Sequence, residues 1–296
     1  MFETLKVTRP GKSLLTFLLV FALSLSALGA DPSSSPLDKL SAEELVAKHL
    51  ESIGTAQARA AVRSRIISGT SSVVFRTEPK GQAAGRAVLA SEGTKNLIGM
   101  SFLSPVYPRE QMGYNGDSFM AAFVTPGVRS MLGTFLMTHA QIFRQGLMGG
   151  TLSSAWPLID LNGRGPRLES AGQKKVDNRM LHELKYLARG GSDLQVKLFF
   201  DQANFQHVRT EYERVIAAPT GDRAYSNIEE REIRYKMVEE FSDFKNEAGL
   251  TLPHTYKIKL LVDSKAGTFL ADWEITLTRF TFNEPIDPQS FNITGS

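Results

Sequence analysis

Regular alternation of apolar and charged side chains near the C-terminus restricts the fold of this chain most strongly. From Tyr256 to residue 262, every second side chain is large and apolar, and lysines stand at two of the positions between. Residues 267–277 repeat the pattern after a short turn, with Asp272 and Glu274 at polar positions. Because successive side chains of a strand point to opposite faces, these segments predict a long hairpin with one apolar face. The apolar face carries Tyr256, Ile258, Leu260, Trp273 and Ile275.

Turn-forming residues divide much of the remaining chain into further strands. Asn115 and Gly116 separate two short alternating segments, and Asn-Gly is a strong hairpin signal. Asp177 and Asn178 separate two more segments in the same way. We expect about a dozen strands in one meandering order, without the helices that connect parallel strands. The sequence therefore predicts a mainly β protein, with a strongly curved antiparallel sheet or incomplete β-barrel and a few covering α-helices.

The first 30 residues have the composition of a secretory signal peptide. Lys6, Arg9 and Lys12 precede an apolar stretch that ends in small residues, and we expect cleavage near Gly29 or Ala30. An uncleaved N-terminal anchor is the alternative. Residues 31–38 are rich in serine and proline, as in a flexible leader.

Residues 39–296 are expected to form a single domain. Within it, residues 39–64 predict N-terminal helices, because Ser41 and Glu44 have the spacing of a capping box and Gly54 suits a helix end. The curved sheet is expected over residues 65–296, with one inserted helix near residues 128–148.

The segment 128–148 departs from the strand pattern. Its apolar residues follow the three-to-four spacing of one helical face, and glycines stand before and after it. Burying each large side chain is worth about 1.5–3 kcal/mol, so this face must cover another apolar surface. The helix is either a permanent part of the core or a removable cover, and the residues are compatible with both. The face carries Met131, Leu132, Phe135, Leu136, Ile142, Phe143, Leu147 and Met148.

The charge of the chain argues against nucleic acid as a partner. The net charge is +3, and residues 1–30 contribute +2 of it from Lys6, Arg9 and Lys12 against Glu3. The remaining charge of about +1, with both signs interspersed, leaves no basic surface for phosphates.

Metal ligands and thiol chemistry are not expected in this chain. It contains no cysteine, and no two of its five histidines have the spacing of a helical zinc site. We expect His49 and His139 on helices, at boundary positions between core and solvent, His182 and His207 at solvated or half-buried strand positions, and His254 in a structural role.

No catalytic motif is present, so the chain is not expected to be an enzyme or to need a cofactor. The GxSxG elbow and the phosphate-binding glycine motifs are absent. Glutamate pairs stand at 229–230 and 239–240, in a strongly charged stretch that predicts a solvated face. An enzyme with an unrecognised site is the least favoured alternative.

Several segments together resemble the outer-membrane lipoprotein-sorting proteins of the LolA/LolB-like periplasmic family. The segments are LSAEELVAKHLESIGT at 40–55, PGVRSMLGTFLM at 126–137, GLMGG at 146–150, AWPL at 155–158, VEEFSDFKNEAGLTLPHTYKIKL at 238–260 and NEPIDPQSF at 283–291. The resemblance extends over most of residues 39–296. The order of these segments along the chain is more specific to the family than any single motif.

The resemblance implies a fold and a function. The fold is an incomplete β-barrel whose concave apolar side is covered by helices, and the function is non-enzymatic binding or transport of a lipid or a lipoprotein acyl chain. It places residues 128–148 on the covering helix and the hairpin residues 256–275 on the concave or core face. It implies a periplasmic monomer with a lipid or acylated lipoprotein as partner and contact with envelope membrane proteins. A cell-envelope sensor with the same fold is the alternative function.

Overall fold

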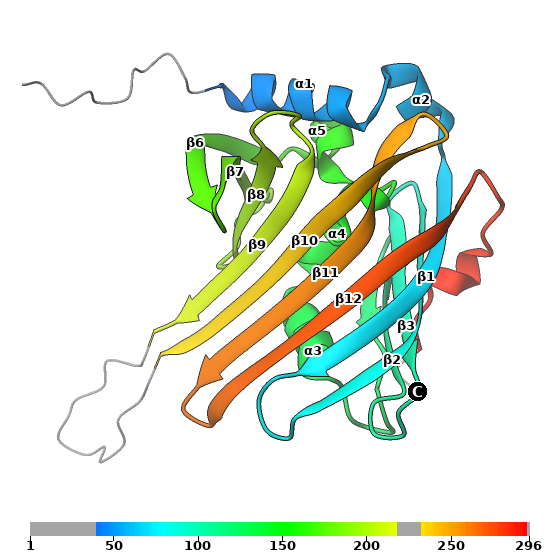
Figure 1. Cartoon of the computed structure of the whole chain (residues 1–296), viewed down its shortest axis with the longest axis vertical. Helices are drawn as coiled ribbons and strands as arrows, with labels where there is room; N and C mark the ends of the chain where they lie inside the picture. Colours follow the sequence, from blue (N-terminus) through cyan, green and yellow to red (C-terminus); the bar gives the residue numbers. More distant parts are fainter. Residues whose placement is uncertain (1–39, 218–231, 295–296) are drawn as a thin grey trace, which may run out of the picture. The chain divides into compact units, whose positions relative to one another are not determined.

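A single curved sheet forms most of the structure, a computed structural model that describes residues 40–217 and 232–294. Twelve strands in this part of the chain pair in the order β5-β4-β3-β2-β1-β12-β11-β10-β9-β8-β7-β6 (Figure 1). All neighbouring strands are antiparallel. The strands are β1 Ser64–Phe75, β2 Gly81–Glu92, β3 Lys95–Phe102, β4 Arg109–Tyr114, β5 Phe119–Ala121, β6 Arg167–Val176, β7 Arg179–Leu187, β8 Gln195–Asp201, β9 His207–Ile216, β10 Ile233–Glu247, β11 Leu250–Ser264 and β12 Gly267–Phe282.

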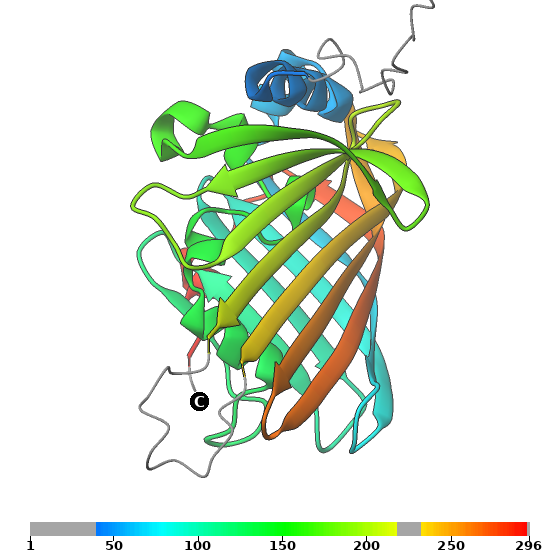
Figure 2. The same cartoon turned by 90° about the vertical axis from the view of Figure 1, so that its left-hand side faces the viewer.

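The sheet folds back on itself but does not close. Its terminal strands β5 and β6 are not neighbours in the strand order, and Figure 2 shows the two halves of the sheet facing each other with helices between them. The fold class predicted from the sequence is therefore confirmed. The three predicted hairpins, β4–β5, β6–β7 and β11–β12, are also present. Asp177 and Asn178 adopt the positive φ angles of 47° and 65° that a tight two-residue turn requires.

Glycines inside the strands allow the sheet to bend sharply. At Gly69, where the pairing of β1 with β12 shifts register, an added Cβ would lie 1.9 Å from the Thr276 carbonyl oxygen. At Gly85 of β2, an added Cβ would lie 1.6 Å from the Ser101 carbonyl oxygen. Only glycine permits such close backbone approaches, so these positions favour strong curvature.

Two helices precede the sheet, as the sequence predicted. Helix α1 is Ala42–Ile53 and α2 is Ala56–Ala61. The capping box at the start of α1 is formed, because the Glu44 amide donates to Ser41 Oγ (3.1 Å) and the Ser41 amide donates to Glu44 Oε2 (2.8 Å). The predicted signal peptide and most of the leader lie outside the described residues.

The remaining helices lie between β5 and β6 in the chain, apart from one C-terminal turn. They are α3 Met131–Thr138, α4 Gln141–Arg144, η2 Gly150–Leu152, η3 Pro157–Ile159, α5 Leu161–Arg164 and η4 Pro288–Phe291. Together with the concave side of the sheet, the helices between β5 and β6 enclose one large hydrophobic core, whereas Phe291 of η4 belongs to a small separate cluster with Ala90 and Leu97.

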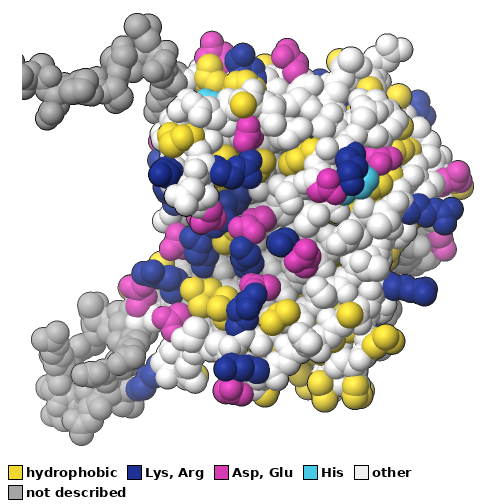
Figure 3. Space-filling view, in the orientation of Figure 1, with side chains coloured by type: hydrophobic (Ala, Val, Ile, Leu, Met, Phe, Trp, Pro, Cys, Tyr) yellow, Lys and Arg dark blue, Asp and Glu magenta, His cyan; other side chains and the backbone are white. Residues whose placement is uncertain are grey.

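The convex face of β9 to β12 is covered by charged side chains of both signs (Figure 3). Arg209 Nη1 lies 2.7 Å from Glu240 Oε1, and Lys257 Nζ lies 3.0 Å from Glu274 Oε2. These pairs belong to the polar positions of the alternating strands, so the apolar positions face the other side.

Candidate functional site

The concave face of β11 and β12 is an apolar wall. The five residues that the alternation placed there are all buried, with exposed fractions of 1% or less: Tyr256, Ile258, Leu260, Trp273 and Ile275. They belong to the same hydrophobic core as the helical insertion. The wall therefore has the composition of a surface that must be covered, whether by protein or by an apolar ligand.

The segment that covers this core, residues 128–148, is called the plug below. It contains two short helices, α3 and α4, where the sequence predicted one, and His139 and Ala140 separate them. Gly146, with φ of 71°, ends the second helix. Most of the predicted apolar face is fully buried in the core: Leu132, Phe135, Leu136, Ile142, Phe143, Leu147 and Met148. Met131 is 39% exposed, so its predicted place on the buried face is wrong.

Met131 is exposed because it is the first residue of α3. Ser130 caps this helix, and its Oγ accepts a hydrogen bond from the Gly133 amide (2.7 Å). Leu132, the next residue, is completely buried, so the apolar face begins one residue later than the spacing indicated.

Side chains, rather than strand pairing, attach the plug to the sheet. In the described part of the chain, the backbone hydrogen bonds of its helical part run within the segment, as from the Leu147 amide to the Ile142 carbonyl (2.9 Å). The Asn96 side chain of β3 donates to the Phe143 carbonyl (3.2 Å). Just beyond the plug, the Arg65 guanidinium of β1 donates to the Thr151 carbonyl (2.5 Å). Such contacts can be broken without disrupting a β-ladder.

A buried carboxylate, Glu239 of β10, lies under the end of the plug. Its Oε1 accepts hydrogen bonds from the Gly149 amide (2.7 Å) and the Tyr256 hydroxyl (2.5 Å), and its Oε2 accepts one from the Tyr212 hydroxyl (2.6 Å). Burial raises the pKa of Glu239 to about 7, against these hydrogen bonds. The prediction that the pair 239–240 forms a solvated face is therefore wrong for Glu239, and the pair 229–230 lies outside the described residues.

A second buried carboxylate, Glu110 of β4, lies under the start of the plug. The Tyr107 hydroxyl donates to its Oε2, and Trp273 Nε1 donates to that hydroxyl oxygen (3.1 Å). Burial raises the pKa of Glu110 to about 7, whereas the Tyr107 and Ser130 side chains lower it. An added Cβ at Gly133 would lie 3.3 Å from Glu110 Oε1, so the carboxylate packs against the first turn of α3.

The histidines are more deeply buried than the sequence predicted. Trp156 Nε1 lies 3.0 Å from His49 Nε2, and the Trp156 ring stacks on His207. Burial lowers the pKa of His49 to about 4 and that of His207 well below its ordinary value. The predicted boundary positions of His49 and His139, and the solvated or half-buried positions of His182 and His207, are wrong because all four are buried. His254 is also buried.

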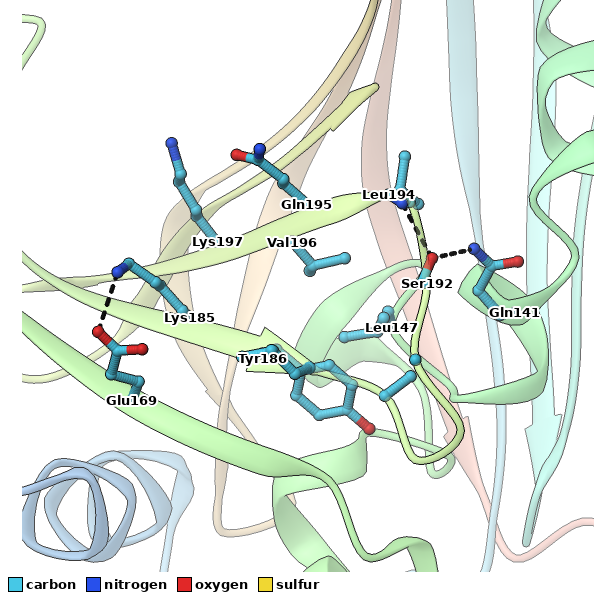
Figure 4. A pocket seen from close by; sticks show the side chains of 13 residues that line it. Gln141, Leu147, Glu169, Lys185, Tyr186, Ser192, Leu194, Gln195, Val196 and Lys197 are labelled. Carbon is cyan, nitrogen blue, oxygen red and sulfur yellow. Dashed lines mark hydrogen bonds and ion pairs between the residues drawn. The ribbon is translucent and has the colours of Figure 1, made fainter. Parts of the chain in front are cut away.

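A cleft opens beside the plug, between the β7–β8 hairpin and α4. Its volume is about 410 Å³, and Figure 4 shows Leu147, Tyr186 and Val196 lying around it. The Gln141 side chain closes one side by donating to Ser192 Oγ (2.9 Å). Because Leu147 and Tyr186 also belong to the hydrophobic core, the cleft reaches the plug from outside.

The functional residues that the sequence reasoning missed share one signal. Arg65, Glu110 and Glu239 are charged, but each is in phase with an apolar, buried strand residue two positions away, respectively Ile67, Met112 and Met237. A charged residue at an inward position of an alternating strand therefore indicates a buried polar contact.

Two classes of feature are not found in the described part of the chain. Between residues 40 and 294, apart from the gap at 218–231, no helix is long and apolar enough to cross a membrane. The same residues contain no group of three or more histidine and acidic side chains placed to hold a metal ion.

No protein-family model and no curated protein matches the chain. Among solved structures, it is similar to a LolA superfamily protein from Nitrosomonas europaea, with 13% identity, 85% of this chain and 97% of that chain covered, and a TM-score of 0.44. It is similar to a DUF1329 family protein from Desulfovibrio piger, with 7% identity, coverage of 84% and 96%, and a TM-score of 0.40. A domain assigned to outer membrane lipoprotein sorting in Vibrio parahaemolyticus has 13% identity, coverage of 83% and 97%, and a TM-score of 0.41. At such identities, function has to be argued from the side chains of this chain.

Proposed function

We propose that this protein is a non-enzymatic binder or carrier of a hydrophobic ligand, a lipid or a lipoprotein acyl chain. The ligand would lie against the apolar wall of β11 and β12, in the space that the plug fills when no ligand is bound. The plug itself is the observation that carries the proposal: its large apolar side chains cover the concave face, although α3 and α4 pair with none of the strands in the described part of the chain.

The plug is suited to move because its helices are too short to be stable alone. Helix α3 has 8 residues and α4 has 4, whereas isolated helices shorter than about 12–15 residues are marginal in water. Their helical form therefore depends on packing in the hydrophobic core that they share with the wall, and a ligand that enters this core would displace them. Leu147 of the plug borders the cleft of about 410 Å³, which offers a ligand a route to the core.

The wall and the cleft favour an acyl chain over a polar ligand. Affinity for such a ligand comes from apolar area removed from water, at about 25 cal/mol per Å². Polar side chains such as Gln141 and Ser192 stand at the rim of the cleft, where a head group would remain in water. The proposed location is the periplasm, after removal of residues 1–30.

Native mass spectrometry of the protein purified from the periplasm tests this function. We expect a polypeptide mass that begins at residue 30 or 31, and additional peaks heavier by the mass of one lipid. Added lysophospholipid should raise the melting temperature of delipidated protein, because a ligand that binds only the folded state stabilises it. A protein without a lipid peak and without this stabilisation would contradict the proposal. Retention of a protein partner by the delipidated chain would instead favour the sensor.

A further inference from the structure

Each end of the plug rests on a buried carboxylate that no basic side chain among the described residues neutralises. Glu110 packs against the first turn of α3, and Glu239 accepts the amide hydrogen of Gly149, the residue after the plug. Both carboxylates are at most 1% exposed. In the described part of the chain, no ion pair joins either of them to a lysine or arginine.

We propose that Glu110 and Glu239 are positioning residues that hold the plug closed while protonated and favour its opening when they lose their protons. The proposal rests on the proposed function only in requiring that the plug can open. It follows from the geometry because a buried charge without a counter-ion is costly, and opening the plug would return both carboxylates to water.

The titratable groups that face the two carboxylates are tyrosines. Tyr212 of β9 and Tyr256 of β11 face Glu239, and Tyr107 of the β3–β4 loop faces Glu110. Burial raises the pKa of each of these hydroxyls well above its ordinary value, so they stay neutral. A neutral hydroxyl can donate to the ionised carboxylate and accept from the protonated carboxyl.

Three histidines and one arginine also lie near the plug. His139 separates the two plug helices, and burial lowers its pKa to about 4. His207 packs against Gly150 and contacts His49, and Arg65 binds the Thr151 carbonyl. A histidine that becomes exposed on opening gains a proton near its ordinary pKa of 6.5, so it favours opening at low pH, opposite to the carboxylates.

The sign of the carboxylate effect follows from linkage. In the closed state burial holds both pKa values at about 7, and in the open state they return toward the ordinary 4.5. The closed state therefore binds more protons than the open state, and its advantage declines as the pH rises through this interval. Between pH 6.5 and 8.5 the ratio of open to closed plug should rise about fourfold for each carboxylate. One exposed histidine would reduce this rise by about twofold.

Thiol labelling measures this ratio directly, since the chain contains no cysteine. Leu136→Cys places a thiol at a fully buried position of the plug. Its rate of reaction with a maleimide, divided by the rate for an unstructured peptide with the same cysteine at the same pH, gives the open fraction. Val208→Cys reports opening of the sheet instead, because Val208 lies in a separate small cluster with Leu181 and Phe199.

The decisive variants replace the carboxylates by the neutral amide of the same shape. In the Glu110→Gln and Glu239→Gln double variant, the rise in plug labelling between pH 6.5 and 8.5 should disappear. In each single variant, the rise should be smaller than in the wild type by a factor of about four. Glu240→Gln is the matched control, because Glu240 is the neighbouring residue on the charged outer face, paired with Arg209 and Lys259. It should retain the wild-type response.

Three results would overturn the proposal. The first is equal labelling of the wild-type plug at both pH values. The second is a double variant that keeps the full rise. The third is labelling of residue 208 in parallel with residue 136, which would mean that the whole fold opens. Labelling needs no lipid, so its result is independent of the carrier function. Lipid binding without a pH response contradicts the role of the carboxylates, and a pH response without lipid binding contradicts the carrier.

Discussion

The interior of this protein contains ionisable side chains as well as apolar ones. Glu110, Glu239 and Arg65 are buried, and each contacts the plug or the turn that follows it. Burial lowers the pKa of Arg65 to about 10, which leaves its guanidinium charged at neutral pH. Such residues are costly to bury and would be replaced by apolar ones if packing alone mattered. Their position under the plug indicates that its attachment is a specific property of the fold.

Gly146 is the plug residue whose replacement the structure constrains most tightly. Its φ is 71°, and an added Cβ would lie 1.9 Å from the Ala155 carbonyl oxygen. Gly93 is a matched control, because its φ is 58° but nothing lies within 4 Å of an added Cβ. Gly93→Ala should cost about 1 kcal/mol from backbone strain alone. Gly146→Ala should lower the free energy of unfolding by about 1–3 kcal/mol more, measured by urea denaturation. Equal costs at the two positions would contradict this packing.

Among the elements, the plug differs from the strands in how it is held. Each strand of the sheet is fixed by a ladder of backbone hydrogen bonds, whereas α3 and α4 depend on apolar packing and a few side-chain contacts. The helical spacing of residues 128–148 predicted this apolar face almost completely. It did not predict the break at His139 and Ala140, because that break depends on what the segment packs against.

Phe135 is central to the plug, since it is buried and its ring stacks on Tyr235 and contacts His139 in a tilted arrangement. Phe135→Asp would place a carboxylate in the apolar core, where it has to be expelled. We expect the variant to retain more lipid than the wild type, because its plug no longer competes for the wall, while the circular dichroism of the sheet is unchanged. Thr134→Asp changes the neighbouring exposed residue and should retain as much lipid as the wild type. Native mass spectrometry of both variants provides the comparison, and normal retention by Phe135→Asp would refute the role of the plug.

At the scale of the whole molecule, the two-residue periodicity was sufficient to predict the class of fold. Alternation assigned Tyr256, Ile258, Leu260, Trp273 and Ile275 to a buried face, and the turn residues located the hairpins. The cleft beside Leu147 could not be predicted, because β7, β8 and the plug are distant in sequence and meet only in the folded chain. The burial of Glu110 and Glu239 was not predicted, because a charged side chain suggests exposure. Their positions in the strand alternation, two residues from the buried Met112 and Met237, indicate that they point inward.

The central claim is that an acyl chain binds against the wall of β11 and β12 in place of the plug. Photo-crosslinking with a fatty acid that carries a diazirine in its chain tests this most directly, with the crosslinked peptides identified by mass spectrometry. The account predicts adducts on residues 256–260 and 273–275, in competition with unlabelled fatty acid. Adducts confined to exposed apolar residues such as Leu103 and Val106 would contradict it.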